Sequence, residues 1–600
     1  MNSTLASQTL SQSLVNVAMG RQPADLLIRN GKWACVQSGE IFSGIDIAVK
    51  GERIAFVGED ARHTLGEHTR VIEANGAYLV PGLLDAHMHV ESGMLTVTEF
   101  ARAVIPHGTT GMFIDPHEIA NVFGLPGVKL MVEEAVVQPI HVWVQVPSCV
   151  PSAVGFETPG ATLEPDDIKQ ALTWPGIIGL GEMMNFPGVA AGDAKLHAEL
   201  MATRQAGKVI GGHYASRDLG IPFHGYVAGG PEDDHEGTTL EDALVRLRQG
   251  MKVMLRHGSA WQDVAAQVKT VTELGVDSRH LLLCTDDCHS QTLVHEGHVD
   301  RALRAAIAAG VSPMVAIQMT TLNTAEHFGL YHEVGLIAPG RFADILIVND
   351  LMDFHTERVI ARGQIIAQEG KLLVDSQPFP YPDWALKSIH LKRSLTADDF
   401  RLPAPMGQKI TAHVIGIIEN HAPTKHLQLD LQVLAGEIRP DRERDVAKIA
   451  VIERHHATGR IQVGLIHGFG FNCPCAVATT VAHDCHHLIV VGTDEQEMAL
   501  AANELARVGG GQVVVREGKV LGLVELCIGG LMSNEAAHIV AGKAASVLDG
   551  FRACGCLLNN PNMQLSLAAL VVIPELRISD LGLVDVSRFE FISVLEKAQG

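Results

Sequence analysis

The stretch VPGLLDAHMHVES at residues 80–92 joins an apolar run to two histidines, His87 and His89, that lie one residue apart. Side chains at positions i and i+2 of a strand point to the same side, so both imidazoles should face one site. Imidazole is a common metal ligand, but a strand-end histidine can also be a hydrogen-bonded core or surface residue. The pair therefore predicts a metal site only if other parts of the chain supply further ligands.

Short apolar strands alternate with amphipathic helical patterns around this stretch. The expected strands lie at residues 77–85, 109–115, 140–148, 176–182, 207–214, 224–230, 250–256 and 279–287. The helical patterns between them include residues 97–108, 196–207, 239–250 and 264–275. The gap between the fifth and the sixth expected strand is too short for a full helix. Eight strands alternating with helices predict an α/β fold with a TIM-like (β/α)8 barrel over residues 81–334.

The segments on either side of this barrel have a different character. Residues 24–80 and 335–375 both contain β-branched runs separated by Gly and Asn-Gly turns, which are typical of short strands. We expect these two segments to form one small β-sandwich domain, built from both flanks of the barrel. Residues 1–23 are expected to be an N-terminal extension and residues 376–400 a Pro-rich linker. Strand and helix patterns mix in residues 401–600, which predicts a C-terminal α+β domain.

The composition is that of a soluble globular protein, with 47% hydrophobic and 19% charged residues. Lys and Arg number 46 against 68 Asp and Glu, which gives a net charge of −22. This charge repels phosphate backbones and anionic membranes, so a small neutral or cationic molecule is a better partner than nucleic acid or a membrane. No apolar run is long enough to span a bilayer, and the N-terminus lacks the basic and apolar segments of a secretory signal.

The 10 cysteines are spread over the chain, which favours free thiols and a cytoplasmic location over disulfides. Cys473 and Cys475, like Cys554 and Cys556, are close in sequence but lack the C-x-x-C spacing of a zinc site. We interpret both pairs as structural. The Gly-rich C-terminal domain leaves room for a homo-oligomer, for which a dimer is the first expectation.

Further metal-capable side chains stand where the other expected strands end. Active-site residues of a barrel come from the C-terminal ends of its strands. The set at these ends is His87, His89, Glu182, His213, His235 and Asp286. Imidazole and carboxylate ligands suit divalent first-row metals such as Zn, Mn or Fe. One strand-end acid is commonly a helix cap or an ion-pair partner, but six such groups at matching strand ends predict a metal centre.

Two ions can share this set if one carboxylate bridges them. Glu182 is the best placed bridge, since it ends the fourth expected strand and has two oxygens. Two ions hold a shared water as hydroxide near neutral pH and polarise the group that it attacks. Asp286 can bind metal and also accept the proton of that water. Asp287 is the alternative to Asp286. We favour Asp286 because it directly follows the apolar strand LLLCT.

The motifs at these positions resemble those of the amidohydrolase superfamily. They are GLLDAHMHVE (82–91), GLGE (179–182), GGHY (211–214), DDHEGTT (233–239), LLLCTDD (281–287) and the return segment GLIAPGRFADILIV (335–348). More narrowly, the sequence is similar to the adenine deaminase family. The narrower motifs are DPHEIANVFG (115–124), EMMNFPGV (182–189), DHEGTTLEDAL (234–244), VAHDCHHLIVVGT (481–493) and GGLMS (529–533). The resemblance covers nearly the whole chain except about the first 20 residues.

This resemblance implies a binuclear metal site and a purine base, adenine, as substrate. Carried over by motif, His87, His89 and Asp286 bind one ion, His213 and His235 bind the other, and Glu182 binds both. Most relatives in the superfamily bridge their ions with a carbamylated lysine at the end of the fourth strand, whereas adenine deaminases have a glutamate there. One position departs from the pattern, because LRHGSA (255–260) has His257 where an acid is associated with this motif.

The resemblance also implies a reaction, the hydrolysis of adenine to hypoxanthine and ammonia. Asp286 would take the proton of the attacking water and pass it towards the leaving nitrogen. Glu236 follows His235 and is expected to act in catalysis or to orient that histidine. Asp115, His117 and Glu118 follow the second strand, where they either contact the purine or form ion pairs and caps at the barrel mouth.

Other interpretations of the chain are open. A related hydrolase could cleave a cyclic amide, as dihydroorotases and hydantoinases do, and a barrel could be a non-catalytic scaffold. The zinc deaminase signature with P-C-x-x-C and the H-E-x-x-H motif are both absent from the sequence. The role of the C-terminal domain is also open. Its polar run, His483, Asp484, Cys485, His486 and His487, could reach over the barrel mouth, but we favour a separate structural or oligomer-forming domain.

Overall fold

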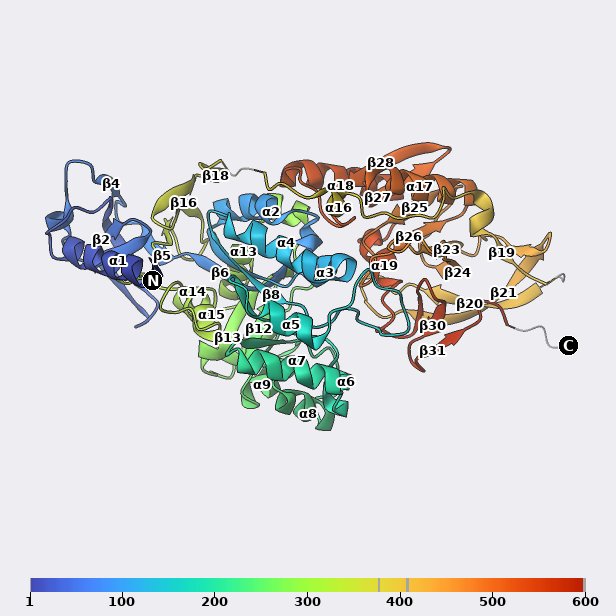
Figure 1. The fold of residues 1–600 in the computed structure, drawn as a ribbon, viewed down its shortest axis with the longest axis horizontal. Coiled ribbons are helices and arrows are strands. Elements are labelled where there is room, and N and C mark those ends of the chain that lie inside the picture. Colours follow the sequence, from blue (N-terminus) through green and yellow to red (C-terminus); the bar gives the residue numbers. More distant parts are fainter. Residues whose placement is uncertain (1, 376–377, 406–408, 597–600) are drawn as a thin grey trace.

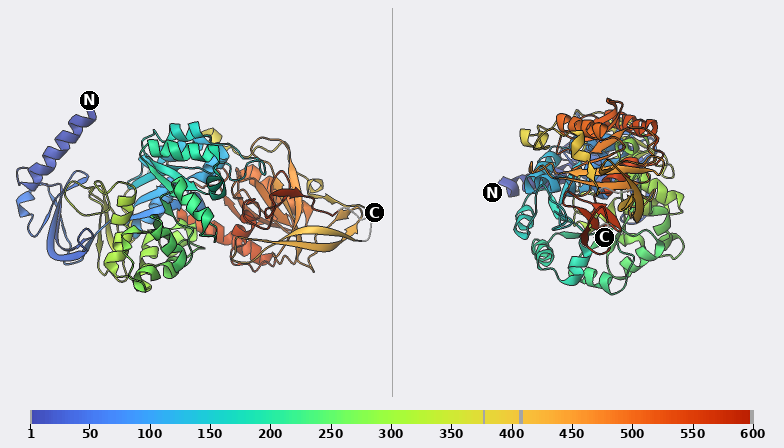
Figure 2. Two further views of the ribbon diagram at one scale, coloured as in Figure 1. Left: turned by 90° about the horizontal axis from the view of Figure 1, so that it is seen from below. Right: turned by 90° about the vertical axis from the view of Figure 1, so that its right-hand side faces the viewer.

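The computed structural model describes residues 2–375, 378–405 and 409–596. Three parts follow one another along the long axis of the molecule (Figure 1). A mixed β-sheet and the N-terminal helix α1 (Asn2–Ala18) lie at one end, parallel strands surrounded by helices lie in the middle, and the C-terminal α+β part lies at the other end. The left-hand view of Figure 2 shows the same elongated arrangement, with α1 projecting from the outer end.

Both flanks of the central part contribute to one nine-stranded sheet in the described chain. Its strands are β1 (Leu26–Cys35), β2 (Glu40–Lys50), β3 (Arg53–Gly58), β4 (Arg70–Glu73), β5 (Tyr78–Pro81), β15 (Ile345–Val348), β16 (Thr356–Ala361), β17 (Gln364–Gln368) and β18 (Lys371–Leu372). The flanks meet where β15 runs antiparallel to β5. The strands therefore form one continuous sheet where two packed sheets were expected, and the sheet is mixed because β1 runs parallel to β4 and β5.

The central part contains two parallel sheets. The first has the order β10-β9-β8-β7-β6-β14 and the second has the order β11-β12-β13. The bounds are β6 (Leu83–His89), β7 (Thr109–Ile114), β8 (His141–Val146), β9 (Ile177–Met183), β10 (Val209–Gly212), β11 (Asp233–Asp234), β12 (Lys252–Arg256), β13 (Leu281–Cys284) and β14 (Asp286–Asp287). The last strand, β14, pairs in parallel with the first, β6. All their carboxyl ends therefore lie at one end of this part.

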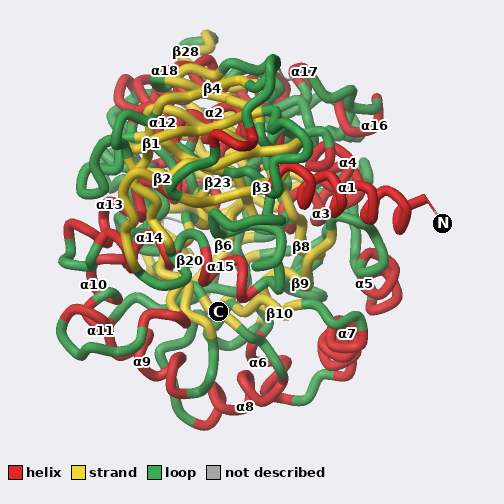
Figure 3. The backbone as a smooth tube through the Cα atoms, turned by 90° about the vertical axis from the view of Figure 1, so that its left-hand side faces the viewer, coloured by secondary structure: helices red, strands yellow, loops and turns green. Residues whose placement is uncertain are grey.

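Helices lie on the outer side of these strands, as Figure 3 shows for α7, α9 and α11. The helices are α2 (Val97–Val104), α3 (His117–Phe123), α4 (Leu125–Val136), α5 (Pro165–Ala171), α6 (Phe186–Ala191), α7 (Ala194–Gln205), α8 (Ile221–Gly229), α9 (Leu240–Arg248), α10 (Val264–Gln267), α11 (Lys269–Thr272), α12 (Ser290–His295), α13 (Val299–Ala308), α14 (Pro313–Met319) and α15 (Leu322–His327). The helical patterns read from the sequence are confirmed at α2, α7, α9 and at α10 with α11. Capping side chains begin several helices, as where Thr96 accepts from the Glu99 amide.

Two strand expectations are wrong. Residues 224–230 form most of helix α8 and not the sixth strand, which is instead the two-residue β11. Phe223 and Tyr226, three residues apart, are both buried on one face of α8, and this helical spacing was hidden within an apolar run. The expected strand at 77–85 falls across β5 and β6. The break lies at Gly82, where a Cβ atom would lie 2.0 Å from Thr110 Oγ1.

The C-terminal part is built on a ten-stranded sheet in the order β19-β22-β21-β20-β24-β23-β26-β25-β27-β28. The strands are β19 (Leu402–Pro403), β20 (Lys409–Gly416), β21 (Lys425–Leu434), β22 (Glu437–Ile438), β23 (Val446–Ile452), β24 (Ile461–His467), β25 (Ala476–Thr479), β26 (Leu488–Gly492), β27 (Gly511–Arg516) and β28 (Lys519–Glu525). Every residue of β23 and β26 is buried, because both strands lie inside the sheet and are covered on its faces.

The remaining elements complete this part and the connections. They are α16 (Asp383–Leu386), α17 (Glu495–Val508), α18 (Ala537–Ala553), α19 (Pro561–Leu567), the small sheet β29 (Leu576–Ile578), β30 (Leu583–Asp585) and β31 (Glu590–Ile592), and the 3-10 turns η1 (Arg62–Thr64), η2 (Glu91–Gly93), η3 (Ile105–His107), η4 (Ser278–His280) and η5 (Ala397–Phe400). Helix α18 packs against α12, so the C-terminal part contacts the carboxyl ends of the parallel strands. Among the helices of the described residues, none has the length and apolar character needed to cross a lipid bilayer.

Candidate metal centre

The strand-end side chains singled out in the sequence converge at one end of the parallel strands. His87 and His89 belong to β6, Glu182 to β9 and Asp286 to β14, while His213 and His235 directly follow β10 and β11. Parallel strands bring their carboxyl ends to the same side, so residues far apart in sequence become neighbours. Five of these six side chains are buried and His213 is partly buried.

Glu182 lies at the centre of the cluster, and each of its oxygens faces a different pair of imidazoles. Its Oε1 atom lies 3.1 Å from His117 Nδ1 and 3.7 Å from His89 Nε2. Its Oε2 atom lies 2.5 Å from His213 Nδ1 and 3.2 Å from His235 Nε2. Glu182 therefore connects two groups of potential ligands through one carboxylate.

Asp286 is arranged in a similar way towards the two histidines of β6, because one of its oxygens lies near both imidazoles. Its Oδ1 atom lies 3.2 Å from His89 Nε2 and 3.8 Å from His87 Nε2. Asp286, the first residue of β14, has a φ of 57°, in the left-handed region. Three sets of ligand atoms within 4.8 Å of one another result, namely His87–His89–Asp286, His87–Glu182–His235 and His89–His117–Glu182.

The protonation and bonding of these groups fit a divalent cation. His87 Nε2 is buried and has no hydrogen-bond partner among the described residues. The His89 Nδ1 atom is hydrogen-bonded to the Asp115 carbonyl oxygen over 2.8 Å, which leaves Nε2 facing the carboxylates. A histidine that donates one ring nitrogen to a carbonyl presents the other as a ligand. The donor set of imidazoles and carboxylates is that of Zn, Mn or Fe sites.

Burial and charge act in opposite directions on the acids of the cluster. Burial raises the pKa of Glu182, but His213, His117 and His235 outweigh it and hold that pKa well below its usual value. Asp286 behaves likewise, because His89, His235 and Arg256 lower its pKa against the effect of burial. Both carboxylates are therefore anionic, as a metal ligand must be.

The pKa values of two imidazoles in the cluster also depend on burial and on the contact with Glu182. Burial lowers the pKa of His213 and His117, but contact with Glu182 raises it to about 9 and about 10 respectively. Without metal these two histidines are therefore protonated at neutral pH, and a metal ion must displace their protons. Metal affinity should consequently rise with pH.

A further layer of hydrogen bonds holds Glu182 in place. The Asp115 carboxylate accepts a hydrogen bond from the Glu182 amide over 2.7 Å, and Ser148 Oγ donates to the Glu182 carbonyl, also over 2.7 Å. The Tyr226 hydroxyl accepts from the His213 amide and donates to the Met183 carbonyl. Tyr226 belongs to α8, so the helix that was taken for a strand supports the cluster.

Arg256 is a functional residue that the sequence reasoning missed. Its guanidinium Nη1 donates to Asp286 Oδ2 over 3.0 Å and also to Glu236 Oε1. Arg256 is the last residue of β12 and is buried. The available signal was a charged residue at the end of an apolar strand, the same signal that identified the acids and histidines.

The residues expected to contact substrate occupy different positions. His117 lies among the potential metal ligands through its contact with Glu182 Oε1. Asp115 is bonded to the Glu182 backbone, as described above. Glu118 points the other way, and its Oε1 atom lies 3.8 Å from His483 Nδ1 of the C-terminal part. Glu236 lies beside His235, with 3.8 Å between Glu236 Oε1 and His235 Nε2.

A cavity of about 440 Å³ opens between the parallel strands and the C-terminal part. Glu91, Glu118 and Trp261 line it from one side, and His483 and Gln512 line it from the other. The C-terminal part is therefore not spatially separate from the ends of the parallel strands, because His483, in the segment between β25 and β26, lines the cavity and lies near Glu118. Its expected structural or oligomer-forming role stays a prediction. Position 257, where the motif departs, does not line this cavity, and the His257 carbonyl accepts a hydrogen bond from Arg301.

The rest of the polar run in the C-terminal part is not arranged for nucleophilic catalysis. Burial, together with Glu157, raises the pKa of the Cys485 thiol well above its usual value. A thiol must ionise to act as a nucleophile. Asp484 lies 3.4 Å from His483, and His487 lies 3.3 Å from Asp580. The run therefore makes contacts within the C-terminal part and also reaches the central part, where His483 lies near Glu118 and Cys485 lies near Glu157.

Comparison with known proteins agrees with this architecture. Residues 78–366 match the amidohydrolase family and residues 421–590 match the adenine deaminase C-terminal domain. An adenine deaminase of Mesorhizobium japonicum is 59% identical over 98% of this chain and 97% of its own length. Adenine deaminase 3 of Rhizobium meliloti is 58% identical over 98% of both chains. A β-aspartyl dipeptidase of Fervidobacterium islandicum is 16% identical over 58% of this chain and 99% of its own, with a TM-score of 0.46.

The parallel strands, the return of β15 to the flanking sheet and the match over residues 78–366 define the class of protein, an amidohydrolase. Such enzymes are hydrolases. Full-length relatives and a matching C-terminal domain then narrow the class. The chain belongs to the adenine deaminase family.

Proposed function

We propose that this chain hydrolyses adenine to hypoxanthine and ammonia at a binuclear metal centre in the Glu182 cluster. The observation that carries the proposal is the position of Glu182, whose two carboxylate oxygens face separate pairs of imidazoles. The names of the relatives, which match almost the whole chain, support adenine as the substrate.

The distances support one assignment of ligands to the two ions. His87, His89 and Asp286 would hold one ion, His213 and His235 the other, and Glu182 both. His117 is a further candidate ligand beside His89, because its ring nitrogen faces Glu182 Oε1. The ions are of the Mn, Fe or Zn type, since these accept mixed imidazole and carboxylate ligands.

When bound, two such ions lower the pKa of a shared water and polarise the carbon that it attacks. The protein residues handle the protons. Asp286 accepts the proton of the attacking water and passes it to the exocyclic nitrogen, which leaves as ammonia only once it is protonated. Arg256 holds Asp286 Oδ2 and Glu236 together, so that Asp286 Oδ1 keeps its orientation towards the reacting atoms.

We propose that the substrate contacts residues that line the cavity and lie outside the Glu182 cluster. Glu118 and His483 line this cavity, and both can exchange hydrogen bonds with a purine edge. Asp115 instead orients Glu182 through the backbone amide. A cavity of about 440 Å³ has the size of a small-molecule site.

The closed (β/α)8 barrel and the domain limits belong to the same proposal. The parallel pairing of β14 with β6 joins the last strand to the first, which supports closure. We keep residues 81–334 as the barrel, 24–80 with 335–375 as the β domain, and 401–600 as the C-terminal domain. A homodimer and a cytoplasmic location stay predictions, and light scattering of the purified chain tests the first.

The decisive experiment measures reaction and metal together. The chain is depleted of metal with a chelator, reloaded with Mn, Fe or Zn, and assayed for ammonia and hypoxanthine from adenine. We expect activity to return in proportion to metal, up to two ions per chain. Cyclic amides such as dihydroorotate or a hydantoin are assayed beside adenine as comparison substrates. Turnover of these but not of adenine, or full activity without metal, would contradict the proposal.

A further inference from the structure

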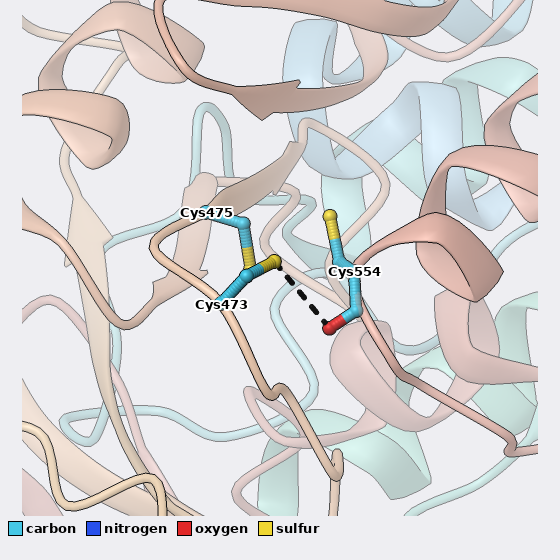
Figure 4. A group of neighbouring side chains, drawn as sticks. All are labelled: Cys473, Cys475 and Cys554. Atoms are coloured by element: carbon cyan, nitrogen blue, oxygen red, sulfur yellow. Dashed lines mark hydrogen bonds between the residues drawn. The ribbon is translucent and has the colours of Figure 1, made fainter.

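Three cysteines of the C-terminal part form a second cluster of potential ligands, far along the chain from the first. Cys473 and Cys475 flank Pro474 in the loop before β25, and Cys554 caps the C-terminal end of α18 (Figure 4). The three Sγ atoms lie within 4.8 Å of one another. Because the third thiol comes from a segment about 80 residues away, the short C-x-C spacing gave no sign of it.

The thiols are held by two well-packed elements. Cys473 Sγ contacts the Cys554 carbonyl oxygen at 3.8 Å, and the Asn472 amide donates to the same carbonyl over 3.1 Å. The Thr493 hydroxyl donates to the Cys473 carbonyl over 2.6 Å and lies 3.9 Å from Cys475 Sγ. One backbone hydrogen bond, from Asn472 to Cys554, and the Cys473 thiol contact thus join the loop to the helix end, while Thr493 holds the loop.

The spacing is close to that of three sulfur atoms around one ion. With metal–sulfur bonds of about 2.3 Å, three thiolates lie roughly 4 Å apart. The three sulfur atoms would have to move towards one another by less than about 1 Å to surround an ion. Cys475 and Cys554 are buried, while Cys473 is only partly buried and leaves a route for an ion to enter.

The surrounding charges suit a cation bound by thiolates. Cys554 stands at the C-terminal end of a helix, where the helix dipole favours positive charge. The Arg516 guanidinium donates to the neighbouring Ala553 carbonyl over 3.0 Å. Three thiolates, one divalent ion and Arg516 have no net charge.

We propose that Cys473, Cys475 and Cys554 bind a thiophilic d10 cation, Zn²⁺ or Cu⁺, at a site separate from the catalytic cluster. Thiolates select these soft ions over Mn²⁺ and Mg²⁺. A Cu⁺ ion is satisfied by the three sulfurs, whereas Zn²⁺ takes a solvent molecule as a fourth ligand. The ion would join the loop before β25 to the C-terminal end of α18.

Cobalt provides a test that the imidazole cluster cannot imitate. The reduced full-length chain is titrated with Co²⁺, whose bonds to thiolate give a near-ultraviolet charge-transfer band that bonds to imidazole and carboxylate do not give. We expect the amplitude of this band at saturating Co²⁺ to correspond to one thiolate-bound cobalt per chain, and we expect the band to disappear when Zn²⁺ or Cu⁺ is added. Which of these two ions displaces cobalt at lower concentration identifies the preferred cation.

Three variants make the test specific. Cys473→Ser and Cys554→Ser should abolish the band, whereas Cys556→Ser, two residues from Cys554 and outside the cluster, should retain it. Cys473→Ser should leave adenine turnover near the wild-type rate, because the half-buried Cys473 touches no residue of the catalytic cluster. Circular dichroism of each variant checks the fold, and the half-buried Cys473 keeps the test valid if Cys554→Ser unfolds.

Several results would overturn the inference. The first is a wild-type chain without the band at saturating Co²⁺ under reducing conditions. The second is a folded Cys473→Ser variant that keeps the band. A third is mass spectrometry that finds two of the three cysteines joined as a disulfide, together with no cobalt binding after reduction. In that case the cluster is a redox pair and not a metal site.

Discussion

Two groups of acid and imidazole side chains lie near the carboxyl ends of the parallel strands, and they differ in how they are built. The first surrounds Glu182 and comes from the ends of parallel strands. The second consists of Glu118, His483 and His486, whose ligand atoms also lie within 4.8 Å of one another. Its acid comes from α3, and its histidines come from the segment between β25 and β26.

The difference shows how the number of imidazole partners affects the pKa of a buried acid. Four imidazoles surround Glu182 and hold its pKa well below normal in spite of burial. Glu118 has His483 at 3.8 Å, and burial raises its pKa above the usual value. A carboxylate needs several cationic partners to stay charged in a dry site. The first group is therefore suited to metal, and the second to hydrogen bonding with a substrate.

The largest effect is expected from removing the charge of the first group. Glu182→Gln keeps the shape of the side chain but loses the anionic bridge, so adenine turnover should fall by about a thousandfold or more. Metal content should fall with it, measured by elemental analysis of the purified protein. Glu199→Gln, a buried acid of α7 outside the cluster, is the control. Full turnover with two bound ions in Glu182→Gln would exclude the bridge.

Variants of Arg256 test whether the acids near the first group need a guanidinium to hold them in place. Arg256→Met removes the bonds to Asp286 and Glu236, so kcat should fall by about 10–100-fold while KM for adenine changes little. Arg256→Lys should recover only part of the loss, because an ammonium group cannot bond both acids as a guanidinium does. An equal loss of metal and kcat would instead make Arg256 essential for metal binding.

The second group is tested by a double-mutant cycle. His483→Gln and Glu118→Gln should each raise KM for adenine by roughly 10-fold, and the double variant should be little worse than either single one. His413→Gln, in β20 of the same C-terminal sheet, is the matched control. Strictly additive effects would mean that the 3.8 Å contact between the two residues has no role in substrate binding.

A third buried acid shows the cost of having no partner. Both carboxylate oxygens of Glu199 are buried without a hydrogen-bond partner among the described residues, and burial raises its pKa from 4.5 to about 8. Between pH 4.5 and 8 the unfolded chain ionises this group while the folded chain keeps its proton, so stability falls across that window.

Glu199→Gln removes this loss of stability. At pH 8 the thermal midpoint should rise by roughly 2–4 °C, and at pH 4.5 the two proteins should unfold alike. Circular dichroism melts at both pH values measure the difference. A variant that is less stable at pH 8 would mean that the Glu199 carboxylate has a charged partner in the folded protein.

The strand-end pattern was a good guide because parallel strands impose it. His87, His89, Glu182, His213 and Asp286 could be identified one by one, since each lies at or just after the end of an apolar strand. His235 was selected by way of an expected strand at 224–230 that is helix α8, and the strand before it, β11, consists of two aspartates. The same reasoning overlooked Arg256, which it left inside a strand. It also mistook α8 for a strand, because a short apolar run has no clear period.

The sequence by itself determined the family, the alternation of strands and helices, and the residue types at the strand ends. These are local properties, since each depends on a motif or on the period of apolar residues. Only the tertiary structure decided that Glu182 divides its oxygens between two pairs of histidines, that His483 reaches Glu118, and that Cys554 joins Cys473 and Cys475. Such contacts connect segments from about 30 to about 365 residues apart, and no local pattern specifies which distant side chain will complete a site.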